Sequence, residues 1–213
     1  MPLNPSRREI LAGTIGTAVG ATLPGVPAFA APSAAIPYGS CVRVDALTGD
    51  DAYRELVARE CSILTAESEM KWDRLRPARG VYDFADADTI VGFAARQGMA
   101  MRGHTLAWYA ALPDWTKEIS SAAEAEAELV SHIDTVVSRY KGVITSGDVV
   151  NEPVPDDPDS PAGLRPCVWT EHLGPDYIKI AFRAAAAADP RARLVVNDYD
   201  LEFAGARFDR RRE

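Results

Sequence analysis

Short apolar runs alternate with longer segments in which apolar residues recur every three to four positions. The runs have the length of strands, and the longer spacing is that of a helix with one buried face. The clearest helix is predicted over 121–140, where Ser121 and Glu124 match a capping box and Gly142 follows the end. Other helices are predicted over 50–59, which Asp50 or Asp51 can cap, over 86–97, which Gly98 stops, and over 174–188. Strands are predicted over 38–44, 61–65, 99–103 and 194–196, and a further strand runs from Val143 until Pro153 closes it.

This alternation of strands and helices predicts an α/β fold with a parallel sheet or barrel. The rival is an open, doubly wound nucleotide-binding sheet. No Gly-x-Gly-x-x-Gly follows the first strand, and no Gly-Lys-Ser/Thr phosphate loop occurs anywhere, so the barrel is favoured. A complete (β/α)8 TIM barrel typically takes about 250 residues. The 213 residues are therefore expected to form such a barrel truncated after about five strands.

Composition narrows the class of protein. Hydrophobic residues make up 47% of the chain and charged residues 25%, which is typical of a soluble globular domain. The formal net charge of -8 argues against nucleic acid or an anionic membrane as a partner. Cys41, Cys61 and Cys167 form no Cys-x-x-Cys pair, so no zinc site is expected. Cys41 and Cys61 lie on strands predicted to be neighbours, where a disulfide is possible.

Residues 1–30 have the features of an export signal. Arg7 and Arg8 form a twin-arginine pattern, an uncharged stretch follows, and Ala28-Phe29-Ala30 supplies a cleavage site. The alternative is an apolar tail with a chance arginine pair. The order of these features favours a twin-arginine signal peptide, then a linker over 31–37 and a barrel over 38–213. The mature chain is expected to be periplasmic or extracellular, with no membrane span.

Chemistry-bearing residues follow the predicted strands, where the active sites of α/β barrels lie. Asn151 and Glu152 end the strand before Pro153, and a carboxylic acid beside an amide suits acid/base work on a polar substrate. The alternative there is a strand-end turn without chemistry. Glu67 and Lys71 follow the second strand, four residues apart, so a helical turn would set them on one face. The alternative for this pair is a surface ion pair.

The third strand is followed by His104 and Trp108. A lone histidine at a strand end is more often structural than catalytic. Trp72, Trp108 and Trp115 lie in these loops; tryptophan is mostly a core residue, but indole faces also stack on sugar rings. Three tryptophans interleaved with Glu, Lys, His and Asn favour an open cleft for a carbohydrate.

Five segments carry a resemblance to a known family. They are Glu67…Met70-Lys71-Trp72-Asp73, Arg102-Gly103-His104-Thr105-Leu106…Trp108, Leu112-Pro113…Trp115, Asp148-Val149-Val150-Asn151-Glu152 and Asn197-Asp198-Tyr199. In this order they resemble the catalytic domain of glycoside hydrolase family 10, the endo-1,4-β-xylanases. Asn-Glu-Pro is shared with other barrel glycosidases, whereas the Met-Lys-Trp-Asp and His-Thr-Leu-x-Trp segments are much more specific.

The resemblance implies a secreted enzyme that hydrolyses xylan with retention of configuration, without cofactor or metal. Glu152 matches the acid/base, and Asn151 the amide that bonds a sugar hydroxyl. Glu67, Lys71, His104 and Trp108 match substrate-binding positions. The family's nucleophile lies in a Thr-Glu-Leu-Asp type segment that this sequence lacks, so no nucleophile is assigned in this chain, and the 213 residues alone are expected to have no appreciable xylanase activity.

Three residues depart from the family pattern: Ser68 stands where Asn is usual, Tyr109 where a second His is usual and Ala111 where Gln is common. Two alternative functions remain open. One is a carbohydrate-binding remnant without catalysis, and the other is a different barrel glycosidase such as a cellulase. Xylan or a xylo-oligosaccharide is the expected partner, and a complete form is expected to be a monomer.

Overall fold

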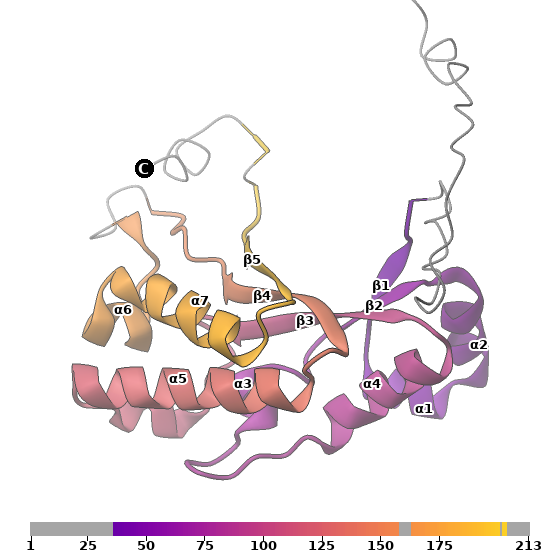
Figure 1. Ribbon diagram of the computed structural model, residues 1–213, viewed down its shortest axis with the longest axis horizontal. Coiled ribbons are helices and arrows are strands. Elements are labelled where there is room, and N and C mark those ends of the chain that lie inside the picture. The colour runs from indigo at the N-terminus through magenta and orange to yellow at the C-terminus, as the bar shows by residue number, and fades with distance from the viewer. Residues whose placement is uncertain (1–35, 158–162, 201, 204–213) are drawn as a thin grey trace, which may run out of the picture. The chain divides into compact units, whose positions relative to one another are not determined.

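The computed structural model describes residues 36–157, 163–200 and 202–203 (Figure 1). The chain divides into two units, Met1–Ile36 and Pro37–Glu213. Nearly all that is described belongs to the second unit. The predicted signal peptide, 1–30, and most of the predicted linker, 31–37, lie outside the described residues.

The described residues form one five-stranded parallel sheet whose strands lie side by side in chain order. All five predicted strands are present, and β1 and β5 form the two edges. This is the arrangement of consecutive strands in an α/β barrel. The strands are β1 (Gly39–Val42), β2 (Ile63–Ala66), β3 (Ala100–Ala107), β4 (Ile144–Asn151) and β5 (Arg193–Asn197).

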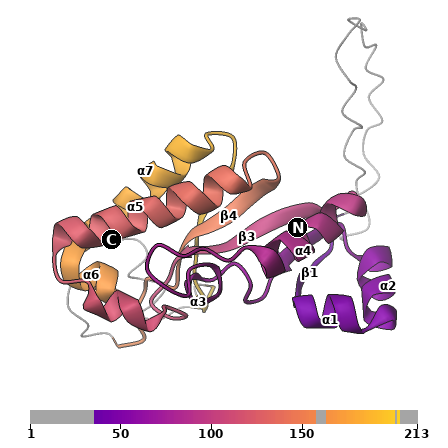
Figure 2. The ribbon, with the colours of Figure 1, turned by 90° about the horizontal axis from the view of Figure 1, so that it is seen from below.

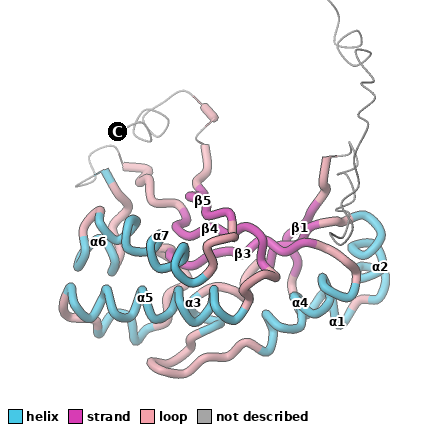
Figure 3. Tube along the Cα trace, viewed as in Figure 1, coloured by secondary structure: helices cyan, strands magenta, loops and turns pink. Residues whose placement is uncertain are grey.

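The helices gather on one side of the sheet, as the cyan and magenta segments of Figure 3 show. The four predicted helices are present as α2 (Asp51–Glu60), α4 (Ala85–Arg96), α5 (Ala122–Arg139) and α7 (Asp176–Ala188). Four shorter elements were not predicted, because they are too short to show a helical period: α1 (Val44–Gly49), α3 (Trp72–Leu75), the 3-10 helix η2 (Asp114–Glu118) and α6 (Val168–Leu173). Figures 1 and 2 show α5 and α7 packed side by side.

Capping residues set the helix boundaries as the sequence predicts. The Asp50 side chain accepts a hydrogen bond from the Tyr53 amide, and Ser121 accepts one from the Glu124 amide. Each such cap contributes about 1 kcal/mol. The expected capping box closes differently, since the Glu124 carboxylate accepts from the Ser120 amide, one residue earlier. Gly98 ends α4 with φ 67°, a conformation that glycine adopts without strain.

β3 extends further than predicted, whereas β4 ends at Asn151, one residue before the predicted end of that strand. β3 continues beyond Gly103 to Ala107, because His104 pairs with Asp148 and Ala107 with Val150 of β4. β4 includes Asn151, so only Glu152 of the Asn-Glu pair lies beyond its strand. Since parallel strands end at one edge of the sheet, Trp108 and Glu152 emerge together there.

The core fills the space between the sheet and the helices in two clusters. One cluster joins β1, β2 and β3 to α1, α2 and α4, and the other joins β4 to α5, α6 and α7. Trp72 and Trp115 belong to the second cluster and are buried. Their indole N–H groups donate to the main-chain carbonyls of Leu106 and Arg76. The interpretation of three sugar-stacking tryptophans is therefore wrong for these two, because they pack in the core.

His132 of α5 is fully buried and stacks on Trp72, with the ring centroids 3.8 Å apart. Burial lowers the pKa of its imidazole well below the usual value, and the nearby positive charge of Arg76 lowers it further. His132 is therefore neutral near pH 7. It serves as an aromatic core residue on the buried face of this helix.

The possible disulfide between Cys41 and Cys61 is not formed, and the register explains why. β1 and β2 are neighbours as expected, but Cys41 lies opposite Thr65, four residues beyond Cys61. A strand rises about 3.3 Å per residue, so this offset far exceeds the Cα separation that a disulfide spans.

Candidate active site

Glu152 is the first residue after β4, and its main chain has a left-handed conformation with φ 51°. The amide of Glu152 donates to the Asn197 carbonyl at 2.7 Å, and its carbonyl accepts from Arg165 Nε at 3.1 Å. The Glu152 side chain is half-buried, and Oε2 accepts a hydrogen bond from Trp108 Nε1 at 3.0 Å. The carboxyl group is thus fixed at the carboxyl edge of the sheet, as an acid/base requires.

The Trp108 side chain lies among predicted site residues that come from the ends of the second, third and fourth strands. The Lys71 ammonium lies 4.9 Å from the centroid of the Trp108 ring, and the His104 ring lies 6.4 Å from it. Trp108 is half-buried, and its carbonyl accepts from Trp169 Nε1 at 3.3 Å. The structure therefore brings Lys71, His104 and Glu152 together around the indole of Trp108. A cation, an imidazole, an aromatic face and a carboxyl group suit a polyhydroxylated ligand.

Asp148, within β4, holds two residues of β3. Its side chain is 4% exposed. One carboxylate oxygen accepts from Arg102 Nη2, and the other is hydrogen-bonded to His104 Nδ1 at 3.0 Å. This bond uses Nδ1 of the His104 ring, so Nε2 is the ring nitrogen that remains for a ligand. The strand-end histidine is thus held by a buried carboxylate.

Asn151, the last residue of β4, is 2% exposed, and its Oδ1 accepts from Asn197 Nδ2 at 2.8 Å. This bond ties the ends of β4 and β5 together. It also uses the carbonyl side of the Asn151 amide, so the NH2 group is the side that remains to donate to a ligand.

Glu67 stands apart from this group. It is exposed, and none of the ion pairs or hydrogen bonds found among the described residues joins it to Lys71. The expected helical turn over 67–71 is absent, because the Lys71 amide bonds the Ser68 carbonyl at 3.0 Å in a tighter turn and α3 begins only at Trp72. The alternative of a Glu67–Lys71 ion pair is likewise not found.

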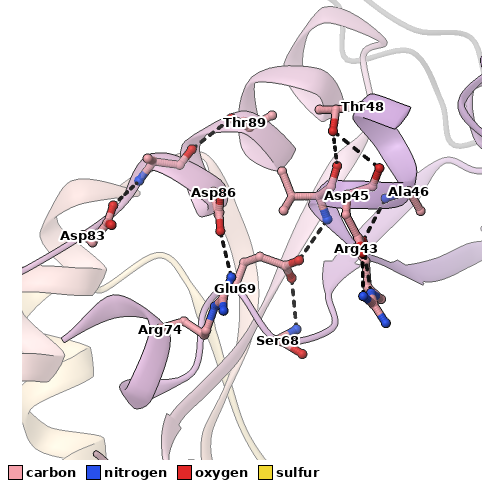
Figure 4. Close-up of polar contacts among 12 residues, drawn as sticks. Arg43, Asp45, Ala46, Thr48, Ser68, Glu69, Arg74, Asp83, Asp86 and Thr89 are labelled. Carbon is pink, nitrogen blue, oxygen red and sulfur yellow. Dashed lines mark hydrogen bonds and ion pairs between the residues drawn. The ribbon is translucent and has the colours of Figure 1, made fainter. Parts of the chain in front are cut away.

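Sequence reasoning passed over the buried Glu69. It accepts hydrogen bonds from the amides of Val44 at 2.8 Å and of Ser68 at 3.0 Å, the second of which Figure 4 shows. It thereby anchors the turn before Lys71 to the start of α1. Three acidic residues in one short loop gave no signal to distinguish this structural carboxylate from a binding one.

The three departures from the family pattern lie beside this group. Tyr109 packs edge-on against Trp108, with the ring centroids 5.6 Å apart, and its ring lies 4.5 Å from the Arg165 guanidinium carbon. Ala111 has φ 51°, and its carbonyl accepts from the Asp73 amide. The Ser68 carbonyl closes the turn before Lys71. All three hold loop main chain or flank Trp108.

Neither a metal centre nor a membrane span is found in the part of the chain that the structure describes. No group of three or more His, Cys, Asp or Glu side chains there could hold a metal ion. No helix among the same residues is long and apolar enough to cross a membrane.

A parallel strand-helix fold with a glutamic acid and an amide at the end of one strand is the arrangement expected of a barrel glycosidase. The family model for glycosyl hydrolase family 10 matches residues 28–210 of the sequence. The chain therefore belongs to glycosyl hydrolase family 10. This finding and the solved structures below confirm the predicted family and the partial (β/α)8 barrel.

Named relatives are xylanases. Endo-1,4-beta-xylanase 3 of Hypocrea jecorina is 42% identical over 149 residues, which cover 70% of this chain and 42% of that protein. Endo-1,4-beta-xylanase C of Phanerodontia chrysosporium is 42% identical over 145 residues, covering 68% of this chain and 35% of that protein. The chain thus spans less than half the length of these two relatives.

Solved structures give the same result. Xylanase 10B from Thermotoga petrophila RKU-1 in complex with xylobiose aligns with a TM-score of 0.75 and 38% identity, covering 83% of this chain and 53% of that one. Native xylanase 10B from Thermotoga maritima aligns with a TM-score of 0.74 and 39% identity, covering 82% and 53%.

Proposed function

We propose that the whole protein is an endo-1,4-β-xylanase that cleaves internal bonds of xylan with retention of configuration. The observation that carries this proposal is Glu152, a carboxyl group fixed by Trp108 at the carboxyl edge of the sheet in a family 10 chain. The xylanase names of the relatives and the xylobiose bound to one solved neighbour support xylan as the substrate.

In the proposed reaction Glu152 first acts as the acid. It donates a proton to the glycosidic oxygen as that bond breaks, and a carboxylate on the other side of the sugar forms the glycosyl-enzyme. Glu152 then accepts a proton from the water that attacks this intermediate. The two carboxyl groups of such a pair lie about 5–5.5 Å apart. We assign no residue of this chain as the nucleophile.

The remaining residues bind the substrate. Lys71 and Asn151 carry N–H donors for sugar hydroxyls, the His104 ring lies beside Trp108 with Nε2 not used by Asp148, and Trp108 offers an indole face. Glu67 is proposed as a binding residue on its motif alone, since it touches none of the others among the described contacts.

The test is to incubate the whole protein with xylan and, separately, with cellulose. We expect xylo-oligosaccharides from xylan, released first as the β-anomer and detected by proton NMR before mutarotation, and no release from cellulose. Release of the α-anomer first would contradict retention. Cello-oligosaccharides alone would indicate a cellulase, and binding of xylan without release would favour the carbohydrate-binding alternative.

We also propose that residues 1–30 direct twin-arginine export, from the order of Arg7-Arg8, the uncharged stretch and Ala28-Phe29-Ala30. Replacing both arginines by lysine should trap the precursor inside the cell, measured as precursor retained in the cell fraction. Replacement of Arg59 and Arg191 by lysine is a matched control that should not affect export. Normal export of the Arg7→Lys, Arg8→Lys variant would point to another route.

A further inference from the structure

We propose that Arg165 is a positioning residue that holds Glu152 and its partner Trp108 in the geometry required for proton transfer. This inference rests on the proposed role of Glu152 as the acid/base. Arg165 lies between β4 and α6, and its side chain is 13% exposed, which is unusually buried for an arginine.

The main chain at Glu152 needs external support. A left-handed φ of 51° is uncommon for a residue other than glycine, and such a conformation persists only where its surroundings hold it. Two hydrogen bonds do so, one from the Glu152 amide to the Asn197 carbonyl and one from Arg165 Nε to the Glu152 carbonyl. Arg165 thus provides the charge-assisted half of this support.

The guanidinium of Arg165 holds the whole segment after β4, not Glu152 alone. Nη2 donates to the Val154 carbonyl at 3.1 Å and to the Tyr199 hydroxyl at 2.9 Å, and Nη1 donates to Asp156 Oδ2 at 3.1 Å. The Tyr199 hydroxyl in turn donates to Asp156 Oδ1 at 2.6 Å. The planar fork therefore has four fixed acceptors from β4 and β5 loops, which a point charge such as lysine could not satisfy together.

Arg165 also supports the other end of the Trp108–Glu152 hydrogen bond. Its guanidinium carbon lies 4.5 Å from the centroid of Tyr109, and Tyr109 packs against Trp108. Arg165 thus supports the main chain of Glu152, which accepts the hydrogen bond, and, through Tyr109, the ring of Trp108, which donates it. Burial by itself lowers the pKa of the Arg165 guanidinium, but the hydrogen bonds with Asp156 and Tyr199 outweigh this effect and raise the pKa overall. The guanidinium therefore stays charged.

The test uses the Trp108 indole N–H signal in a nitrogen-15 NMR spectrum of the chain, assigned by its loss in Trp108→Phe. In Arg165→Met this signal should move upfield or broaden, because the bond to Glu152 is no longer fixed. Hydrogen exchange at the Glu152 amide should accelerate about tenfold or more, as expected for loss of a charge-assisted hydrogen bond. In the whole protein, kcat on xylan should fall about tenfold with KM nearly unchanged, since acid placement matters in the transition state.

Arg59→Met is the matched control, because Arg59 is exposed on α2 and pairs only with Glu60 among the contacts described. It should leave all three readouts unchanged. If Arg165→Met does not fold, the variants Arg165→Lys and Tyr199→Phe take its place in the test. Each should change the Trp108 signal, the Glu152 exchange rate and kcat in the same direction but by less. A lowered melting temperature with an unchanged Trp108 signal and unchanged Glu152 exchange would overturn the proposal and leave Arg165 a stabilising residue only.

Failure of the proposed function has a different signature. Xylotriose should perturb the Trp108 signal of the unmodified chain. No perturbation would count against sugar binding at this site, whereas the effects of Arg165→Met on Trp108 and Glu152 would remain.

Discussion

Replacing Glu152 by alanine in the whole protein should slow xylan hydrolysis by roughly 10²–10⁴-fold, the usual contribution of a positioned general acid. The xylose leaving group of xylan departs as a poor alkoxide unless it is protonated. Aryl xylosides with an activated phenol need little protonation, so their first step should be much less affected. The measurement is kcat/KM on both substrates.

The fold should survive this change, because Glu152 is only half-buried and its main-chain bonds do not depend on the side chain. Glu171→Ala is a suitable control: it removes an exposed carboxylate from α6, close in sequence to the same loop. It should retain nearly full activity on both substrates. Equal losses on both substrates in Glu152→Ala would assign Glu152 another role.

Replacing Asp148 by asparagine should both destabilise the fold and weaken substrate binding. The amide keeps the size of the carboxylate, but only one of its two ends can accept, so Arg102 or His104 loses its partner. Hydrogen bonds to charged groups contribute about 1.5–3 kcal/mol, and a loss of that order in the free energy of unfolding is expected. KM for xylo-oligosaccharides should rise, because His104 is no longer held.

Asp114→Asn is the matched control for this prediction. Asp114 pairs with Lys117 on the surface, where both side chains are largely exposed, and such pairs contribute about 0–1 kcal/mol. Urea unfolding of the two variants measures the difference. Equal, small changes in both would show that the buried carboxylate does not organise β3 and β4 as the structure indicates.

The elements that could be predicted from the sequence are those with local signals. The caps at Asp50 and Ser121 and the glycine after α4 fixed helix ends because each acts within four residues. Strand lengths were less accurate, since β3 extends through pairing with β4, a contact over forty residues away in sequence. Local signals also cannot reveal α1 or α6, which are six residues long.

In the site, too, residues in local motifs could be predicted, whereas residues that act through contacts distant in sequence could not. Motifs brought out Glu152, Trp108, His104 and Lys71, which the structure places together, but not the residues that hold them. No sequence motif marks Arg165, because two of its partners are main-chain carbonyls, which any residue could supply, and the Tyr199 hydroxyl comes near it only through folding. The same limit explains Trp72 and Trp115, which had loop positions in the sequence but fill the core. Burial depends on which helices cover a loop.

The central claim is that Glu152 protonates the leaving group of a retaining xylanase, and azide rescue of Glu152→Ala tests it most directly. In the whole protein with an activated aryl xyloside, azide can attack the glycosyl-enzyme without needing a base. Turnover should then rise with azide concentration and yield β-xylosyl azide, identified by NMR. No rescue, or formation of α-xylosyl azide, would contradict the assignment of Glu152 as the acid/base.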